Sequence, residues 1–278
     1  MSLGNESNQY TLGKGEVYFG RFPNGTYTSA AVRERYLGNT PEFNLTIEEE
    51  KLDHYSADRG IREKDESISL QVDRTGTLVT DNVDLENVAL FFFGSKSANV
   101  DAGGAIDGEF ADVEQGGYYQ LGVSDARPTG AKNLAGEDDD SNSAGVAPVF
   151  FDATDSNSAA TPYVEGTDYE VDLARGRVYV IPGGGIVEGS TLGYTATVKA
   201  HSLDRVISGS TAVAGCLRFL AENPVGPKID YFFPSTKLSP NGDYALKGDE
   251  WQQIPLTIEI LKPTAREAIY ADGQPYNP

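Results

Sequence analysis

Two stretches of the chain alternate strictly between apolar and polar residues, which is the pattern of a strand with one buried face. The apolar positions in 42–48 are Phe43, Leu45 and Ile47, and 67–73 alternates in the same way. We expect the two strands to pair antiparallel, with one apolar face and one face of acids and hydroxyls. The predicted apolar face comprises Phe43, Leu45, Ile47, Ile68, Leu70 and Val72.

The connection between these strands is long and highly charged. Eleven of the eighteen residues in 49–66 are charged, with both signs present. A connection of this length is normally functional or mobile, so it is either a solvated loop or an arm that projects and becomes ordered against a neighbour. The arm residues that we single out are Glu49, Lys51, Asp53, His54, Tyr55, Asp58, Arg59, Arg62 and Lys64.

One segment has the spacing of a helix. In 84–94, Leu85, Val88, Ala89 and Phe92 recur at i, i+3, i+4 and i+7, acidic residues stand at the start, and Gly94 ends the pattern. We expect these four apolar side chains to pack this flanking helix against one face of a sheet.

Strand patterns dominate the rest of the chain. A hairpin is predicted from 169–173 and 177–181, and further strands from 192–198, 216–221, 229–233, 243–246 and 251–261. About ten strands and one helix predict a mainly β protein, a β-sandwich or barrel with one flanking α-helix. We interpret 1–278 as a single domain in which 96–165, with 13 acids and 3 bases, is an acidic surface insertion.

Composition narrows the function classes. The 278 residues include 22 Lys and Arg against 42 Asp and Glu, a formal net charge of −20. This balance argues against a protein that grips nucleic acid, because phosphate binding needs clustered basic residues. The single Cys216 excludes an internal disulfide, and with only His54 and His201 no Cys/His zinc cage can form. We also expect no membrane span and no signal peptide.

No catalytic constellation is recognisable, so we expect neither an enzyme nor a cofactor or metal site. Gly13, Lys14 and Gly15 lack the remaining residues of a phosphate loop, and 189–193 has threonine in the nucleophile position of a GxSxG elbow. The four acids of 137–140 are interpreted as a solvated charge run rather than a calcium site. An assembly subunit, a carbohydrate-binding module and a hydrolase with a carboxylate pair remain as alternatives.

Several segments carry a resemblance to a known family. They are GKGEVYFG (13–20), YLGNTPEFNLTIEEEKLDHYSADRGIREKD (36–65), DLENVALFFFG (84–94), GTDYEVDLARGRVYV (166–180), LRFLAENPVGPKIDYFFP (217–234) and ALKGDEWQQIPLTIEI (245–260). In this order they resemble the major tail tube proteins of long-tailed bacteriophages with non-contractile tails. The resemblance spans most of the chain but excludes roughly 96–145.

The resemblance implies a structural role. Six copies would form a ring whose strands close an inner barrel between subunits, rings would stack into a hollow tube, and the projecting β-hairpin arm would reach the adjacent ring. DNA would be a passenger through the lumen, and tape-measure and tail-terminator proteins would be further partners. The protein would be made in the cytoplasm of the host bacterium and reside in the virion tail. The residues expected to face the lumen are Glu42, Asn44, Thr46, Glu48, Ser67, Ser69, Gln71 and Asp73.

Overall fold

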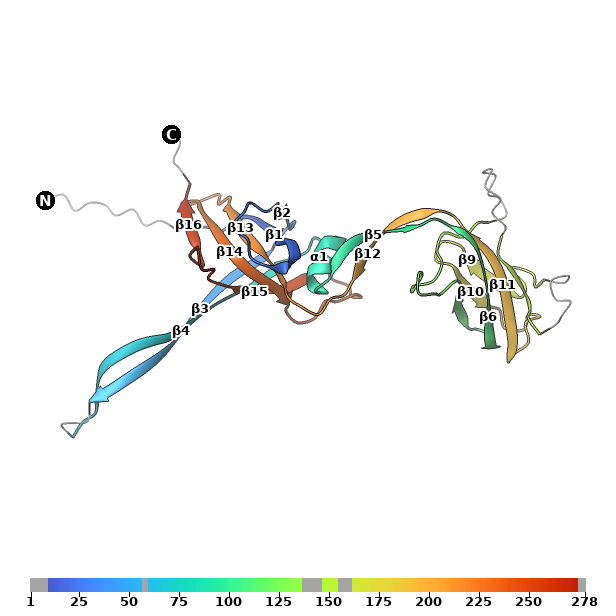
Figure 1. The fold of residues 1–278 in the computed structure, drawn as a ribbon, viewed down its shortest axis with the longest axis horizontal. Helices are drawn as coiled ribbons and strands as arrows, with labels where there is room; N and C mark the ends of the chain where they lie inside the picture. The colour runs from blue at the N-terminus through green and yellow to red at the C-terminus, as the bar shows by residue number, and fades with distance from the viewer. Residues whose placement is uncertain (1–9, 57–59, 137–146, 155–161, 275–278) are drawn as a thin grey trace. The chain divides into compact units, whose positions relative to one another are not determined.

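The computed structural model describes residues 10–56, 60–136, 147–154 and 162–274 (Figure 1). The chain is mainly β, with several antiparallel sheets and, in these ranges, one α-helix. It divides into two compact units: unit 1 is Met1–Ser97 with Asp204–Pro278, and unit 2 is Ala98–Leu203. None of the helices within the described ranges is long and apolar enough to cross a membrane.

Unit 1 is built on one antiparallel sheet of eight strands. Their order is β2-β1-β13-β14-β15-β4-β3, with β16 also paired to β14. The strands are β1 (Gly15–Arg21), β2 (Arg35–Tyr36), β3 (Glu42–Ser56), β4 (Glu63–Thr80), β13 (Val213–Ala221), β14 (Ile229–Pro240), β15 (Ile254–Ile260) and β16 (Tyr270–Gly273). A short 3₁₀ turn, η1 (Pro23–Gly25), follows β1.

The core of unit 1 lies on one face of this sheet, because apolar residues alternate along its strands. In β15, Ile254, Leu256 and Ile258 are fully buried, whereas Glu259 on the opposite face is exposed. The helix α1 (Leu85–Phe91) adds Leu90 to the same apolar cluster. Sheet and helix therefore share one hydrophobic core, as the apolar spacing predicts.

Unit 2 has a core of its own. Its two three-stranded antiparallel sheets have the orders β6-β11-β8 and β7-β10-β9. Phe150, Val178 and Leu192, one from each of three strands, are fully buried together. The strands are β6 (Gly104–Val113), β7 (Tyr118–Gln120), β8 (Val149–Asp152), β9 (Tyr169–Asp172), β10 (Arg177–Val180) and β11 (Ser190–Val198).

The two units are joined by a pair of strands, β5 (Ser95–Asp101) and β12 (His201–Ile207), and the unit boundaries fall within both. The antiparallel pairing of β9 with β10 confirms the hairpin predicted at 169–181. The surface insertion predicted at 96–165 differs from unit 2, which continues to Leu203 and includes that hairpin. Unit 2 extends this far because β11 is the central strand of one of its sheets and β10 is the central strand of the other, and both contribute to its core.

Candidate assembly surfaces

The hairpin formed by β3 and β4 extends well beyond the rest of the sheet. The two strands pair antiparallel from Glu42 opposite Val79 to Ser56 opposite Glu63, which confirms the pairing predicted from their alternation. β15 pairs with β4 only through Thr75–Thr80, and β3 is the last strand of the sheet. Residues 48–56 and 63–73, here called the distal hairpin, therefore pair only with each other among the described residues (Figure 1).

One face of this hairpin begins in the core and continues uncovered. Phe43 packs against Phe219 and Phe233, with ring centroids 5.9 and 6.0 Å away. Beyond it on the same face, Leu45, Ile47 and Val72 are 40%, 61% and 39% exposed. These three side chains, here called the apolar strip, form a row of hydrophobic surface that unit 1 leaves open to solvent.

A β-bulge interrupts the predicted alternation of the second strand. Glu50 pairs with Gln71, but its neighbour Lys51 pairs with Ser69, so Leu70 is an extra residue in β4. The β4 side chains from Ser69 back to Glu66 are thereby shifted to the opposite face, and a second bulge at Asp65 restores the original faces for Lys64 and Glu63. The expectation that Ser67 and Ser69 share a face with Glu48 and Asp73 is therefore wrong.

The other expected lumen residues do share one face. The register places Gln71 opposite Glu50 and Asp73 opposite Glu48, on the same side as Glu42, Asn44 and Thr46. The amide of Asn44 donates to Glu42 at 2.5 Å, and that of Gln71 donates to Asp73 at 2.7 Å.

The shifted serines join a network of paired charges. Ser69 donates to Glu49, and Lys51 forms an ion pair with Glu49 at 2.9 Å. Asp53 accepts from Ser67 at 2.6 Å and forms an ion pair with Lys64 at 2.6 Å.

These contacts also shift the pKa values of the two acids. The Ser69 hydrogen bond, then that of Lys51, holds the pKa of Glu49 below its usual range, and Lys64, then Ser67, does the same for Asp53. We call this side of the distal hairpin the paired face, because both of its lysines are matched with acids.

The opposite side of the distal hairpin carries acids that lack such partners in the described ranges, together with the exposed side chains of Leu52 and Ile68. Glu48, Glu50 and Glu66 lie on it, and within the described ranges none of them forms an ion pair. Among the residues that the structure describes, the side-chain donor to Asp73 is the neutral amide of Gln71. We call Glu48, Glu50, Glu66 and Asp73 the acidic face.

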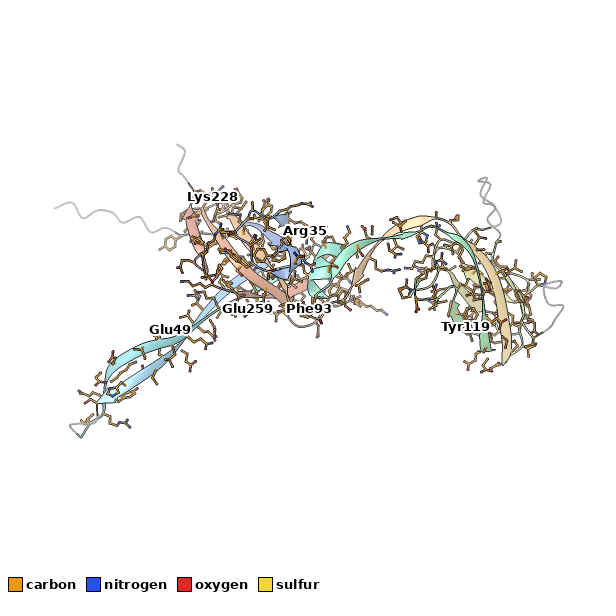
Figure 2. The ribbon with its side chains drawn as sticks, viewed as in Figure 1. Arg35, Glu49, Phe93, Tyr119, Lys228 and Glu259 are labelled. Atoms are coloured by element: carbon orange, nitrogen blue, oxygen red, sulfur yellow. The ribbon has the colours of Figure 1, made fainter. Side chains whose placement is uncertain are left out.

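The remaining arm residues lie near the tip. The imidazole Nδ1 of His54 is 2.6 Å from a carboxylate oxygen of Asp65, and the guanidinium of Arg62 is 5.9 Å from the centroid of the Tyr55 ring. Asp58 and Arg59 lie outside the described residues. All the other arm residues, except Arg62 in the connection, belong to the distal hairpin, which includes Glu49 (Figure 2).

The flanking helix is confirmed, but its inward face differs from the prediction. Ala89 is buried and Val88 packs against the core, as expected. Leu85 and Phe92 are exposed. The prediction that these two side chains pack against the sheet is therefore wrong. The buried positions of this two-turn helix also include Asn87 and Leu90, and Phe92 already stands at its C-cap.

The helix ends in a Schellman motif with an unusual residue. Phe93, labelled in Figure 2, follows the helix directly. Its φ is 54°, the left-handed conformation usually taken by glycine. The amide of Gly94 donates to the carbonyl of Ala89 at 2.8 Å, which completes the motif. Gly94 is needed for a different reason, since a Cβ there would clash with the carbonyl oxygen of Ile207.

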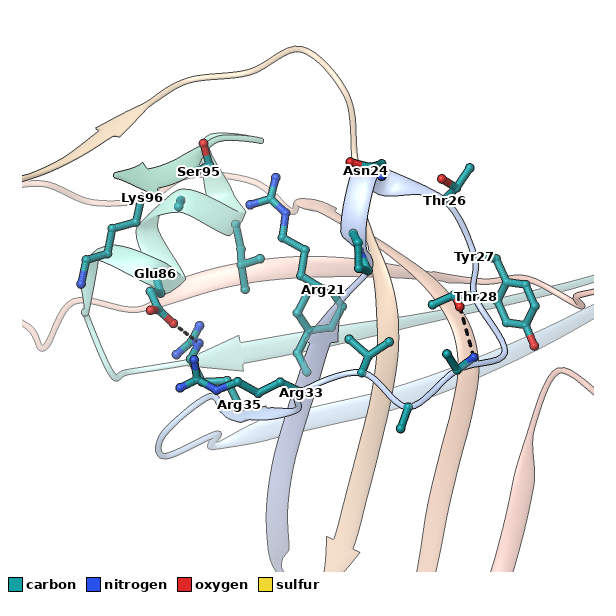
Figure 3. Close-up of a pocket in the computed structure, with 17 residues that line it drawn as sticks. Arg21, Asn24, Thr26, Tyr27, Thr28, Arg33, Arg35, Glu86, Ser95 and Lys96 are labelled. Carbon is teal, nitrogen blue, oxygen red and sulfur yellow. Dashed lines mark hydrogen bonds and ion pairs between the residues drawn. The ribbon is translucent and has the colours of Figure 1, made fainter. Parts of the chain in front are cut away.

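A cleft of about 720 Å³ lies beside α1, and its lining includes Arg21, Arg33, Arg35 and Lys96 (Figure 3). We call it the basic cleft. No sequence pattern indicates this cleft, because these residues come from β1, from β2 and the segment before it, and from β5. Isolated basic residues in separate segments give no sequence signal.

A buried asparagine organises one wall of this cleft. The amide of Asn87 donates to the carbonyls of Leu37 and Asn82, both at 2.8 Å, and its oxygen accepts from Arg35 at 2.5 Å. Arg35 also forms ion pairs with Asp84 at 3.2 Å and Glu86 at 2.6 Å (Figure 3). Arg35 is therefore fixed in place and largely neutralised.

The other cations differ in how far they are neutralised. Lys96 forms an ion pair with Asp204 at 2.9 Å. Arg21 donates to the carbonyl of Gly94 at 2.8 Å, a contact that leaves its charge uncompensated. Arg33 is exposed and has no side-chain partner within the described residues. The cleft thus presents two uncompensated guanidinium groups.

In the part of the chain that the structure describes, no group of three or more His, Cys, Asp or Glu side chains is placed to hold a metal ion.

Comparison with known proteins identifies one family. A family model described as a protein of unknown function matches residues 10–128 and 149–274, which include strands of both units. The curated proteins contain no match.

Proposed function

The chain belongs to the family UCP028589, and we propose that it is a structural subunit that assembles with its own copies into stacked rings forming a hollow tube. The observation that carries this proposal is the distal hairpin, whose strands pair only with each other among the described residues. In keeping with the resemblance of the sequence, the tube would be the tail tube of a long-tailed, non-contractile bacteriophage.

The apolar strip supports association with a second copy. An isolated two-stranded hairpin is at best marginally stable in water, so an uncovered hairpin with a row of hydrophobic side chains favours a covering partner. Leu45, Ile47 and Val72 lie on one face, where a neighbouring strand pair could bury them together. The free edge of β3 offers backbone N–H and C=O groups to the same neighbour.

Ring closure follows from repeating this contact. A contact between two different surfaces of identical subunits generates a ring when its rotation closes. If the hairpins of six subunits pair side by side, their strands form one barrel that no single copy can make. The six-subunit count is an expectation from the resemblance to tail tube proteins.

The acidic side of the hairpin suits a channel for DNA. With the apolar strip turned into the wall, Glu42, Glu48 and Asp73 would face the lumen on one surface. Carboxylates repel the phosphates of DNA, and at physiological salt the screening length is about 8 Å, so the repulsion acts only near the wall. DNA would then pass as a non-specific passenger. By the same resemblance, tape-measure and tail-terminator proteins would be further partners in the virion tail.

The carbohydrate-binding alternative has less support. Such sites present free aromatic faces, and the exposed rings include Trp251 in unit 1 and Tyr118 in unit 2. The guanidinium of Arg177 lies 4.9 Å from the centroid of the Tyr118 ring, and the centroid of Tyr179 lies 4.7 Å from it. Tyr118 is thus already stacked on its own neighbours, and Trp251 is a single ring.

Removing the distal hairpin tests the proposal. Residues 48–73 are replaced by Asn-Gly, a two-residue turn that can join Ile47 to its partner Arg74. In sedimentation velocity, the full chain should form large particles as its concentration rises, whereas the shortened chain should stay a folded single copy. A shortened chain that assembles like the full chain would contradict the proposal, as would a full chain that stays monomeric.

The lumen assignment has its own test. Glu42, Glu48 and Asp73 are exchanged together for lysine, and assembled tubes are incubated with short duplex DNA at about 0.01 M salt, where screening extends to about 30 Å. The lysine tubes should retain DNA and the unmodified tubes should not. Equal retention by both would place these residues away from the lumen.

A further inference from the structure

The basic cleft is anomalous in a chain with a net charge of −20. Arg35 and Lys96 are matched by acids, but Arg21 and Arg33 present uncompensated charge to the same space. A volume of about 720 Å³ falls in the range of clefts that bind small ligands, so several side chains fit inside. The ligand suited to such a cleft carries carboxylates.

The chain itself carries the complementary surface. The distal hairpin has eight Asp and Glu residues against two Lys. Both lysines form ion pairs on the paired face, Lys51 with Glu49 and Lys64 with Asp53. Towards the tip, the acidic face leaves Glu50 and Glu66 without an ion-pair partner in the described ranges. Opposite potentials on two surfaces of one chain favour contact between copies.

The two surfaces lie at opposite ends of unit 1. β4 runs from Glu63 near the tip to Thr80, a span of about 56 Å at ~3.3 Å per residue. The helix α1 starts at Leu85, just after that far end (Figure 1). Residues of α1 line the basic cleft. The acidic tip therefore cannot reach the cleft of its own chain, but it can reach the cleft of another copy.

We propose that the basic cleft receives the tip end of the acidic face, which carries Glu50 and Glu66, from the distal hairpin of another copy in a head-to-tail contact. Glu48 and Asp73 lie farther from the tip and keep their place among the lumen-facing residues. A contact between two different surfaces adds copies along a line when its rotation does not close, and this contact would extend the assembly in that way. This inference rests on the proposed self-assembly and deepens it, because it names the contact that stacks one ring on the next. Arg33 and Arg21 would bind the carboxylates of Glu50 and Glu66.

Charge reversal on each surface tests the contact. Arg33→Glu changes an exposed residue without a side-chain partner, so the fold should be unaffected. It should raise the critical concentration for tube formation about tenfold, the effect of a close interfacial charge pair. Glu50→Lys with Glu66→Lys should act in the same direction. Combining all three changes should return the value to within about threefold of the unmodified chain, because the pairs are coupled.

Matched controls separate this contact from a general charge effect. Lys247→Glu makes the same change at an exposed lysine outside the cleft lining, and it should leave the critical concentration unchanged. Tubes of Arg33→Glu that form at the normal concentration would overturn the inference while leaving the proposed function standing. So would a combined variant that fails to recover assembly although both parent variants fold.

Disulfide trapping gives a second measurement that does not depend on tubes. Chains with Glu50→Cys and chains with Ser95→Cys, a residue of the cleft lining, are mixed and mildly oxidised. Cys216 does not compete, because it is buried and desolvation raises the pKa of its thiol. We expect a disulfide between the two variants that Arg33→Glu suppresses.

The two measurements together distinguish the hypotheses. A disulfide in a sample that never forms rings or tubes would support the head-to-tail contact and contradict the proposed function. Tubes without the disulfide would contradict the contact alone. Chains that neither assemble nor form the disulfide would contradict both.

Discussion

The apolar strip provides the sharpest prediction about assembly. Leu45, Ile47 and Val72 are exposed in the single chain, so changing all three to serine should leave the fold of unit 1 intact. Surface substitutions of this kind usually alter the free energy of unfolding by no more than about 0.5 kcal/mol each. The same substitutions should strongly weaken association, because they remove the hydrophobic surface that a neighbouring copy is expected to cover.

The magnitude follows from the exposed fractions. At 40%, 61% and 39%, the surface still open on Leu45, Ile47 and Val72 equals that of about one and a half whole side chains. Full burial of such a side chain contributes about 1.5–3 kcal/mol, so the loss is about 2–4 kcal/mol for each subunit contact. The critical concentration for assembly should therefore rise about 30- to 1,000-fold.

Sedimentation velocity over a concentration series measures this shift, with thermal unfolding as the check on the fold. The matched control is Val164→Ser with Val187→Ser, two side chains of unit 2 that are 59% and 65% exposed. The control should assemble normally, because the account assigns the contact to the hairpin. Normal assembly of the triple variant, with both proteins folded, would refute the reasoning about the strip.

Three further predictions concern the fold and the two units. Asn87→Ala should destabilise unit 1 by about 2–4 kcal/mol, because the carbonyls of Leu37 and Asn82 and the guanidinium of Arg35 each lose one hydrogen bond, and an unchanged melting temperature would contradict this. Arg127 beside Asp101 holds the pKa of that carboxyl well below its usual range near 4, so the pair stabilises unit 2 above pH 4 and that stabilisation is lost as the pH falls toward the lowered folded-state pKa. Asp101→Asn should therefore reduce the change of unfolding free energy with pH, as measured by urea titrations at several pH values. If the variant and the unmodified chain show the same change with pH, this role of the pair is contradicted. Replacing 99–202 by a short glycine-rich turn should leave unit 1 folded and able to assemble, as microscopy and sedimentation can establish.

Patterns in the sequence predicted the strands and the helix that depend on residues close together along the chain. Alternation in 42–48 and at 169–181 depends on a strand having one buried side, and both stretches are paired strands. The helix predicted in 84–94 also depends on local spacing, and at its start Asp84 accepts a hydrogen bond from the amide of Asn87. These elements could be identified without knowing what packs against them.

Features that depend on distant partners could not be predicted in this way. The bulge at Leu70 shifts Ser67 and Ser69 to the other face, and the alternation of 67–73 gives no sign of it. The exposure of Phe92 reflects where the core of unit 1 ends. Grouping Arg21 with Arg33 in one cleft requires the tertiary fold, because single basic residues are common on any surface.

Electron microscopy of the purified full chain at rising concentration tests the central claim most directly, because rings and tubes are visible without a label. The account predicts annular particles that stack into hollow cylinders, with the bore lined by the hairpins of β3 and β4. A chain that remains a single copy at every concentration, or that forms only solid or irregular aggregates, would contradict it.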